Sequence, residues 1–168
     1  MTKLKIKKYG DFVLRRKTEM ILEITDDIKK LAYDMLETMY LAPGIGLAAP
    51  QVDVSLKLCV IDADPKQKSP IVMINPKIIA DENKIVAGEG CLSFPGFYED
   101  IKRFDNIVVK YTDLNEKKCE IKAQGLLAKV VQHELDHLDA KLFIDYLPAW
   151  KRKVIEKEIR RKKKIGDW

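Results

Sequence analysis

The chain has 168 residues, of which 46% are apolar, so its size and composition fit one globular domain with a real hydrophobic core. No apolar run is long enough to span a bilayer, no apolar segment follows the basic N-terminus as in a signal peptide, and three widely spaced cysteines argue against a disulfide framework, so a cytoplasmic protein with no membrane contact is predicted. The net charge of +5 belongs to the tail, because residues 151–164 contain nine Lys or Arg and two Glu, which leaves −2 on the rest of the chain.

The first regular element expected is a helix over residues 25–41. Thr25 or Asp26 can cap its start, and Pro43 with Gly44 ends it. Its apolar side chains recur at helical spacing, at positions 28, 31, 32, 35, 36 and 39. The small residues that follow, GIGLAAPQ, predict a loop or an irregular edge.

Five stretches after this loop have the composition of strands. They are residues 57–64, 71–79, 84–87, 107–113 and 118–123. The first is expected to end in a turn at Pro65. Pro76 within the second favours an edge strand or a bulge. The last two are expected to be joined by a turn around Asn115 and Glu116.

Two more helices complete the chain. Residues 125–138 are densely apolar, which predicts a helix buried in the middle of the fold. Pro148 opens the last helix, whose narrow apolar stripe is expected to contain Trp150, Val154, Ile155 and Ile159. The order of helix, strands, helix and helix predicts an α+β fold with mixed, mainly antiparallel strands.

Both histidines of the chain lie in the second of these helices, in the pentapeptide HELDH. Positions i and i+4 share a helix face, so His133 and His137 can reach one metal ion. Glu134 lies beside the first of them, where it can accept a proton from a hydrolytic water. HExxH also arises by chance, but imidazoles in an apolar helix need partners, and this favours a metal site.

A catalytic metal site usually has three protein ligands, so a third donor is needed. Glu156 and Glu158 lie downstream, as in a zinc endopeptidase, but their surroundings are typical of solvated charge pairs. Cys91, in EGCLSFPG, lies among turn-forming residues between predicted strands, which is not a regular core position. Cys59 and Cys119 are interpreted as small core residues.

Two other functions remain open at this point. A zinc endopeptidase would use Glu156 or Glu158 and would not need Cys91. A non-catalytic RNA-binding module would act through the basic tail, and HELDH would then belong to a closed structural metal site. As a phosphate-binding loop, GIGLAAPQ lacks the required Lys-Ser/Thr ending.

Three segments, GIGLAAPQ, EGCLS and QHELDHL, in this order and at these separations, resemble the three motifs of the peptide deformylase family. The similarity extends from about residue 9 to about residue 145. It implies a metal-dependent hydrolase that removes the N-formyl group from the N-terminal methionine of nascent polypeptides and releases formate. It also implies strands packed around the HExxH helix, with residues 1–147 as the catalytic domain and residues 148–168 as a basic C-terminal helix of that same domain.

The resemblance assigns a role to each matching position. It implies three metal ligands, Cys91, His133 and His137. Glu134 would be the general acid and base, and the oxyanion would be bound by the Gln51 side chain and the backbone N–H of Leu92. The substrate positions would be Gly46, whose backbone pairs with the peptide, and four residues around the methionine side chain, Ile45, Gly90, Leu126 and Val130.

The resemblance also implies the cofactor and the partners. One divalent ion is expected, Fe²⁺ in the cell, with Zn²⁺, Ni²⁺ or Co²⁺ in preparations. Formyl-methionyl nascent chains are the expected partners, and the ribosome is a candidate partner for the basic helix; no DNA is expected. Three residues depart from the family pattern. Asp53 and Ala140 replace glycines, and Lys129 stands where an apolar residue or Arg is familiar.

Overall fold

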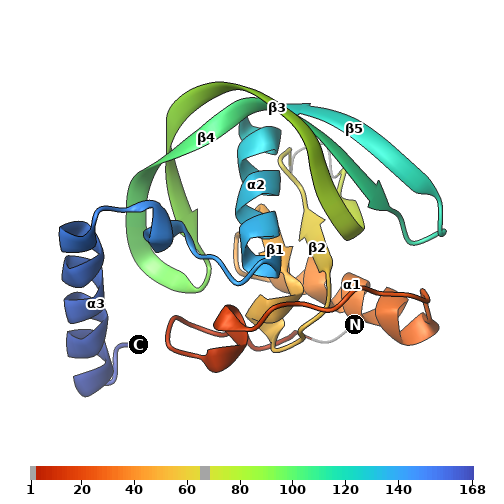
Figure 1. Ribbon diagram of the computed structural model, residues 1–168. Helices are drawn as coiled ribbons and strands as arrows, with labels where there is room; N and C mark the ends of the chain where they lie inside the picture. The colour runs from red at the N-terminus through yellow and green to blue at the C-terminus, as the bar shows by residue number, and fades with distance from the viewer. Residues whose placement is uncertain (1–2, 65–68) are drawn as a thin grey trace.

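The computed structural model describes residues 3–64 and 69–168, so the turn predicted at Pro65 lies outside the described residues. Within them, three α-helices accompany a five-stranded antiparallel sheet in the order β1-β2-β3-β4-β5 (Figure 1). The helices are α1 (Asp26–Leu41), α2 (Leu126–Leu138) and α3 (Ala149–Lys164). The strands are β1 (Gly46–Ala48), β2 (Leu58–Ile61), β3 (Ile71–Cys91), β4 (Phe94–Thr112) and β5 (Lys118–Gln124). The predicted α+β class is confirmed.

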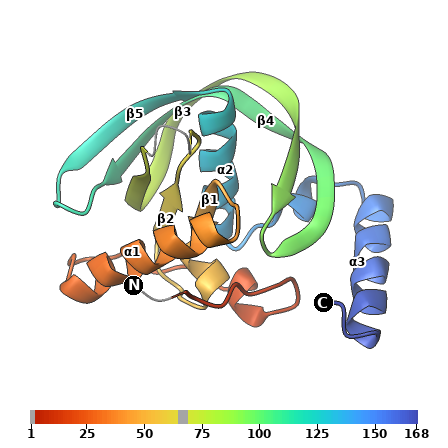
Figure 2. The same cartoon turned by 180° about the vertical axis from the view of Figure 1, so that it is seen from behind.

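The sheet is dominated by the hairpin of β3 and β4, which arches over α2 in both views (Figures 1 and 2). The two strands predicted over residues 71–79 and 84–87 are wrong as separate elements, because both belong to β3. Pairing of backbone groups with β4 continues β3 through its exposed polar residues, which have no apolar pattern. Pro76 lies at a register shift between Ile74 and Lys77, which agrees with the bulge expected at this proline.

The first two thirds of β4, residues 94–106, were not expected from the sequence, because glycine, proline and charged side chains interrupt the alternation. Its start changes the interpretation of EGCLSFPG. Cys91 pairs with Phe94 across the hairpin, so Leu92 and Ser93 form a two-residue turn. Cys91 is therefore the last residue of a strand and does not lie in a loop between strands.

The segment GIGLAAPQ forms the short edge strand β1 followed by the 3-10 helix Ala49–Val52. This agrees with the expected irregular edge. Asp53 follows it with φ +71°, and Ala140 follows α2 with φ +60°. Both positions therefore require the left-handed backbone that glycine adopts without strain. A residue with a side chain adopts it at a cost of roughly 1–2 kcal/mol.

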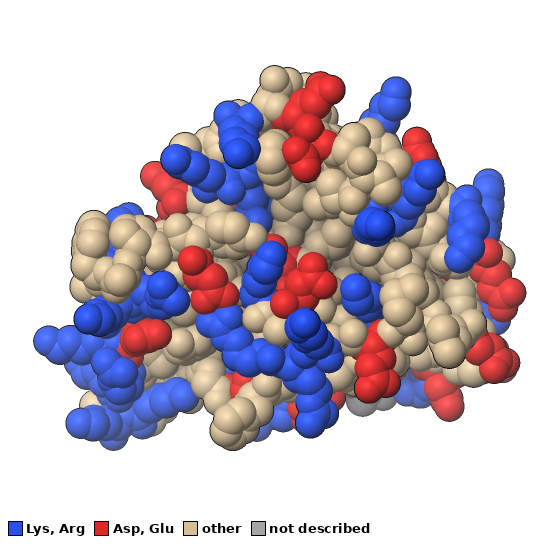
Figure 3. Space-filling model, viewed as in Figure 1, with Lys and Arg blue, Asp and Glu red and all other residues tan. Residues whose placement is uncertain are grey.

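The two outer helices begin close to their predicted positions. Thr25 caps α1 by accepting a hydrogen bond from the Ile28 amide at 3.4 Å. In α3, Ile155 and Ile159 are buried, but Trp150 and Val154 are 65% and 61% exposed, so half of the predicted stripe is wrong. The basic side chains of α3 gather at the lower left of the molecule (Figure 3).

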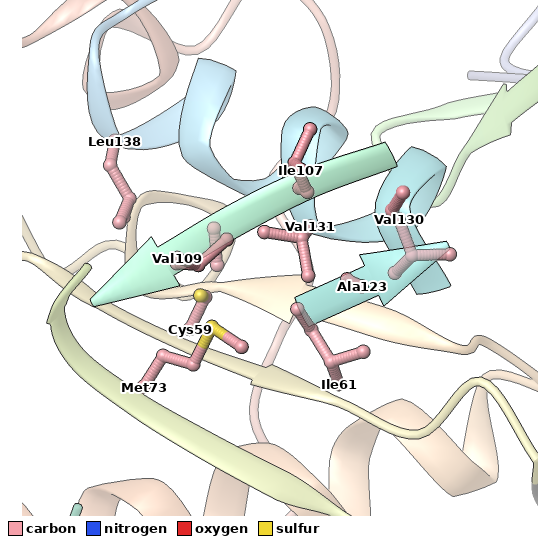
Figure 4. Packing of buried hydrophobic residues seen from close by; sticks show 11 residues of the cluster. Cys59, Ile61, Met73, Ile107, Val109, Ala123, Val130, Val131 and Leu138 are labelled. Carbon is pink, nitrogen blue, oxygen red and sulfur yellow. The ribbon is translucent and has the colours of Figure 1, made fainter. Parts of the chain in front are cut away.

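The helix α2 contacts all five strands. Its buried side chains Val130, Val131 and Leu138 pack in one cluster with residues of the sheet, including Cys59 and Met73 (Figure 4). Cys59 is fully buried, as predicted, but Cys119 is half-buried on β5 and outside this core. None of the helices in the described residues combines the length and hydrophobicity needed to cross a lipid bilayer.

Candidate active site

The inward face of α2 presents His133, Glu134 and His137, all of them buried. The end of β3 brings Cys91 to the same place. The ligand atoms of Cys91, His133 and His137 all lie within 4.8 Å of one another, and Cys91 Sγ is 3.3 Å from His137 Nε2. The fold thus brings together a thiol and two imidazoles from segments more than forty residues apart in the sequence.

These donors fit a divalent metal ion. A thiolate with two neutral imidazoles is a familiar ligand set for Zn²⁺ and the neighbouring transition metals. The buried Nδ1 of His137 has no partner among the described residues, and no fourth His, Cys, Asp or Glu of the described chain joins the cluster. Three protein ligands leave a coordination position open, as a catalytic site requires.

The glutamates of the endopeptidase alternative lie elsewhere. Glu156 accepts a hydrogen bond from the Tyr9 hydroxyl at 3.1 Å, and Glu158 forms an ion pair with Arg161 at 2.6 Å. Neither joins the cluster of ligand atoms. The structure therefore favours Cys91 as the third donor.

A buried ion pair orients the first imidazole, and sequence reasoning missed it. Glu89 Oε2 lies 2.9 Å from His133 Nδ1, and Arg103 donates to both oxygens of Glu89, at 2.6 and 3.0 Å. Burial would raise the pKa of Glu89, but the hydrogen bonds from His133 and Arg103 outweigh it and lower the pKa to about 2. The ionised carboxylate holds the proton on Nδ1, which leaves Nε2 of His133 free to ligate a metal.

The Gln51 side chain is fixed by its own backbone turn. The Ala48 amide donates to Gln51 Oε1 at 2.9 Å, so the NH₂ group points the other way. This group lies 3.6 Å from Cys91 Sγ and donates to Ser93 Oγ at 3.2 Å. A buried amide donor is thereby directed at the ligand cluster, next to the turn that contains Leu92.

Glu134 is the unusual carboxylate of the site. Its Oε2 is buried and has no hydrogen-bond partner among the described residues. Burial is the main reason why the pKa of Glu134 rises to about 7, with the Glu89 and Asp136 carboxylates adding to the rise against the effect of His133. A carboxyl group with a pKa near neutrality can both take and return a proton.

These groups border a pocket of about 460 Å³. It is lined by all the site residues predicted from the sequence except His137, which is buried beneath it: Ile45, Gly46, Gln51, Gly90, Cys91, Leu92, Leu126, Val130, His133 and Glu134. A Cβ on Gly46 would overlap Glu134 Oε1 and crowd Val130 Cγ1, so glycine at this position leaves room for both side chains. A Cβ on Gly90 would meet the ring of Tyr98, another lining residue, which is largely exposed and would have to move aside.

Comparison with known proteins points to one family. The model of the polypeptide deformylase family matches residues 3–153. A peptide deformylase of Endomicrobium trichonymphae is 68% identical over 168 residues, which is all of both chains. The crystal structure of a peptide deformylase from Legionella pneumophila has a TM-score of 0.93 at 39% identity, covering 98% of each chain.

A second solved structure is the complex of an Ehrlichia chaffeensis peptide deformylase with actinonin. It has a TM-score of 0.91 at 38% identity, and the match covers 96% of this chain and 98% of the other. The family model, the full-length relative and the solved structures all point to the family that the three motifs resemble. The chain therefore belongs to the polypeptide deformylase family, whose enzymes remove the N-formyl group from nascent peptides.

Proposed function

We propose that this chain deformylates nascent peptides in the pocket above Cys91, His133 and His137, with Glu134 as the proton carrier. One observation supports this most directly. Three metal-binding donors lie within 4.8 Å of one another, next to a buried carboxylate that has no partner among the described residues. Structural metal sites do not need such a group, whereas hydrolysis does.

Cys91, His133 and His137 would hold one divalent ion, Fe²⁺ in the cell and Zn²⁺, Ni²⁺ or Co²⁺ in some preparations. When bound, such an ion supplies Lewis-acid chemistry that activates water and polarises the formyl oxygen. Glu89 and Arg103 keep His133 in the tautomer that can ligate.

Glu134 would move the proton. It accepts a proton as water oxygen attacks the formyl carbon, and it returns the proton to the departing nitrogen as the C–N bond breaks. The products are formate and a peptide with a free amino group. The pKa of about 7 that burial gives Glu134 suits both transfers near neutral pH.

The developing negative charge on the formyl oxygen would be met by the Gln51 amide and the backbone N–H of Leu92. Gln51 is suited to this because the Ala48 amide fixes its orientation before substrate arrives. Loss of one such preorganised donor typically raises the barrier by roughly 3 kcal/mol.

The pocket would select the first residue of the substrate. Ile45, Gly90, Leu126 and Val130 would surround the methionine side chain, and the peptide would pair with the backbone of Gly46 as an added strand. Gly46 lies so close to Glu134 that a Cβ there would overlap the carboxylate, so this part of the pocket is narrow and would favour the small formyl group over larger acyl groups.

The activity and the ligand set can be tested together. Anaerobically purified protein is expected to release formate from a formyl-Met peptide, to leave the acetyl-Met peptide intact, and to contain about one metal ion per chain. The Cys91→Ser variant is expected to lose most metal and most activity, because a hydroxyl is a poorer ligand than a thiolate for these ions. Formate assay and elemental analysis provide the measurements.

Cys119→Ser is the control, since Cys119 is half-buried on β5 and does not belong to the cluster of ligand atoms. It is expected to keep metal and activity. Unchanged metal content in Cys91→Ser would remove Cys91 from the ligand set, and failure to release formate would contradict the proposed reaction.

We also propose that α3 docks on the ribosome, which would place the enzyme in the cytoplasm. The helix is anchored by Ile155 and Ile159 on one side, and it exposes basic side chains on the other (Figure 3). A row of cations suits ribosomal RNA, which is recognised through its phosphates. Residues 148–168 would thus form part of the single catalytic domain and also its docking surface.

Deleting α3 would expose buried isoleucines, so charge removal is the sharper test. The triple variant Lys153→Gln, Lys157→Gln, Lys164→Gln alters exposed side chains only. Its affinity for ribosomes is expected to fall roughly tenfold or more at low salt, with a weaker salt dependence, while hydrolysis of a short formyl peptide is retained. Cosedimentation with ribosomes would measure this, and unchanged affinity would contradict the docking proposal.

A further inference from the structure

The wall of the pocket contains one cation that the reaction does not use. Among the lining residues, the charged side chains other than the imidazole of His133 are Glu89, Glu134 and Lys129. Glu89 is neutralised by Arg103, and Glu134 is assigned to proton transfer. Lys129 is therefore the lining residue whose charge is left without a role.

Lys129 closes the pocket between α2 and β3. It lies about one helical turn after Leu126 on α2, and its side chain reaches across to the strand. There Lys129 Nζ donates to the Gly88 carbonyl at 3.1 Å. No carboxylate of residues 3–64 and 69–168 forms an ion pair with it, including Asp100, which pairs with Gly88 across the hairpin. The ammonium is thus held at the pocket wall without an ion-pair partner among the described residues.

The distance from the reacting carbon indicates which part of a substrate meets this charge. Lys129 precedes Glu134 by five residues, which is about 7.5 Å of helix. In a formyl peptide the second Cα lies roughly 6 Å from the formyl carbon, given 3.8 Å between successive Cα atoms. The side chain of the residue after methionine can therefore come within reach of Lys129.

We propose that Lys129 is a specificity-determining residue that favours formyl-methionyl peptides with an acidic second residue. The inference rests on the proposed placement of substrate between Gly46 and α2. A carboxylate at the second position would be attracted by the ammonium, and a second-position lysine would be repelled.

The test compares formyl-Met-Glu, formyl-Met-Ala and formyl-Met-Lys peptides that are otherwise identical. For the parent enzyme, kcat/KM is expected to be roughly three- to tenfold higher for the Glu peptide than for the Lys peptide at low salt, and the ratio should shrink as salt is added. In Lys129→Met the ratio is expected to fall close to one, whereas Lys129→Arg should preserve it. The quantity compared is this ratio within each variant, so a general change in activity does not affect it.

Lys122→Met is the matched control, because Lys122 is exposed on β5, does not line the pocket, and carries the same charge. It should keep the parent ratio. Equal kcat/KM for the Glu and Lys peptides in the parent enzyme would overturn the inference, as would an unchanged ratio in Lys129→Met. Either result would leave the proposed function standing as long as the Ala peptide is deformylated; loss of that reaction would instead contradict the proposed function itself.

Discussion

Replacing Glu134 with Gln is expected to lower kcat by roughly two to four orders of magnitude while the protein keeps its fold and its metal. The amide has nearly the same shape, so it fits against Gly46 as the carboxylate does. It cannot accept a proton from water or return one to the leaving nitrogen. Because burial holds the pKa of Glu134 at about 7, the parent carboxyl group exchanges its proton readily near neutral pH.

Glu37→Gln is a stringent control for this experiment. Glu37 lies on α1, and its Oε2 is also buried without a partner among the described residues, but Glu37 does not line the pocket. It should show near-parent kcat. Metal content and thermal stability of both variants should match the parent protein. If Glu134→Gln retained near-parent turnover with full metal content, the proton carrier would have to be another group.

Secondary structure was predictable where apolar spacing determined it and not where backbone pairing did. The helix over residues 25–41 has both a cap and a periodic apolar face, so it was predicted to within one residue. The middle of β3 has neither, and its exposed residues 80–83 are strand because β4 pairs with them. In α3, Trp150 and Ile155 are both apolar residues of the predicted stripe. The rest of the fold buries Ile155 and leaves Trp150 exposed.

The residues of the site also differ in whether the sequence alone could predict them. HELDH is a local pattern with fixed helical geometry, so its residues could be named from the chain alone. Cys91 was a candidate from its turn-forming neighbours and from the family resemblance, but its position at a hairpin end did not follow from either. Arg103 carries no local signal, since its role depends on the register that places β4 beside Glu89. Only the folded sheet shows that this arginine lies behind the metal ligands.

Substitution of Arg103 by Met is expected to reduce the free energy of unfolding by about 3–5 kcal/mol. Arg103 and Glu89 are only 4% and 5% exposed, and the guanidinium also donates to Asp136 at 2.7 Å. Removing it leaves the Glu89 carboxylate buried with His133 as its remaining hydrogen-bond partner, and its desolvation is then poorly compensated. Since Glu89 orients His133, affinity for the metal is expected to fall roughly 10- to 100-fold as well.

The double variant Glu89→Gln, Arg103→Met separates these two effects. It removes both buried charges, so unfolding in urea should show recovery of much of the stability lost in the single variant. The amide oxygen that replaces the Glu89 carboxylate can still accept from His133 Nδ1, but a neutral amide holds the imidazole less strongly, so metal affinity should recover less than stability does. Arg161→Met, which breaks the exposed pair with Glu158, is the control and should leave stability nearly unchanged. If Arg103→Met were no more destabilising than that control, the buried pair would be a passive neighbour of the ligands, and the orientation of His133 would have to come from the metal itself.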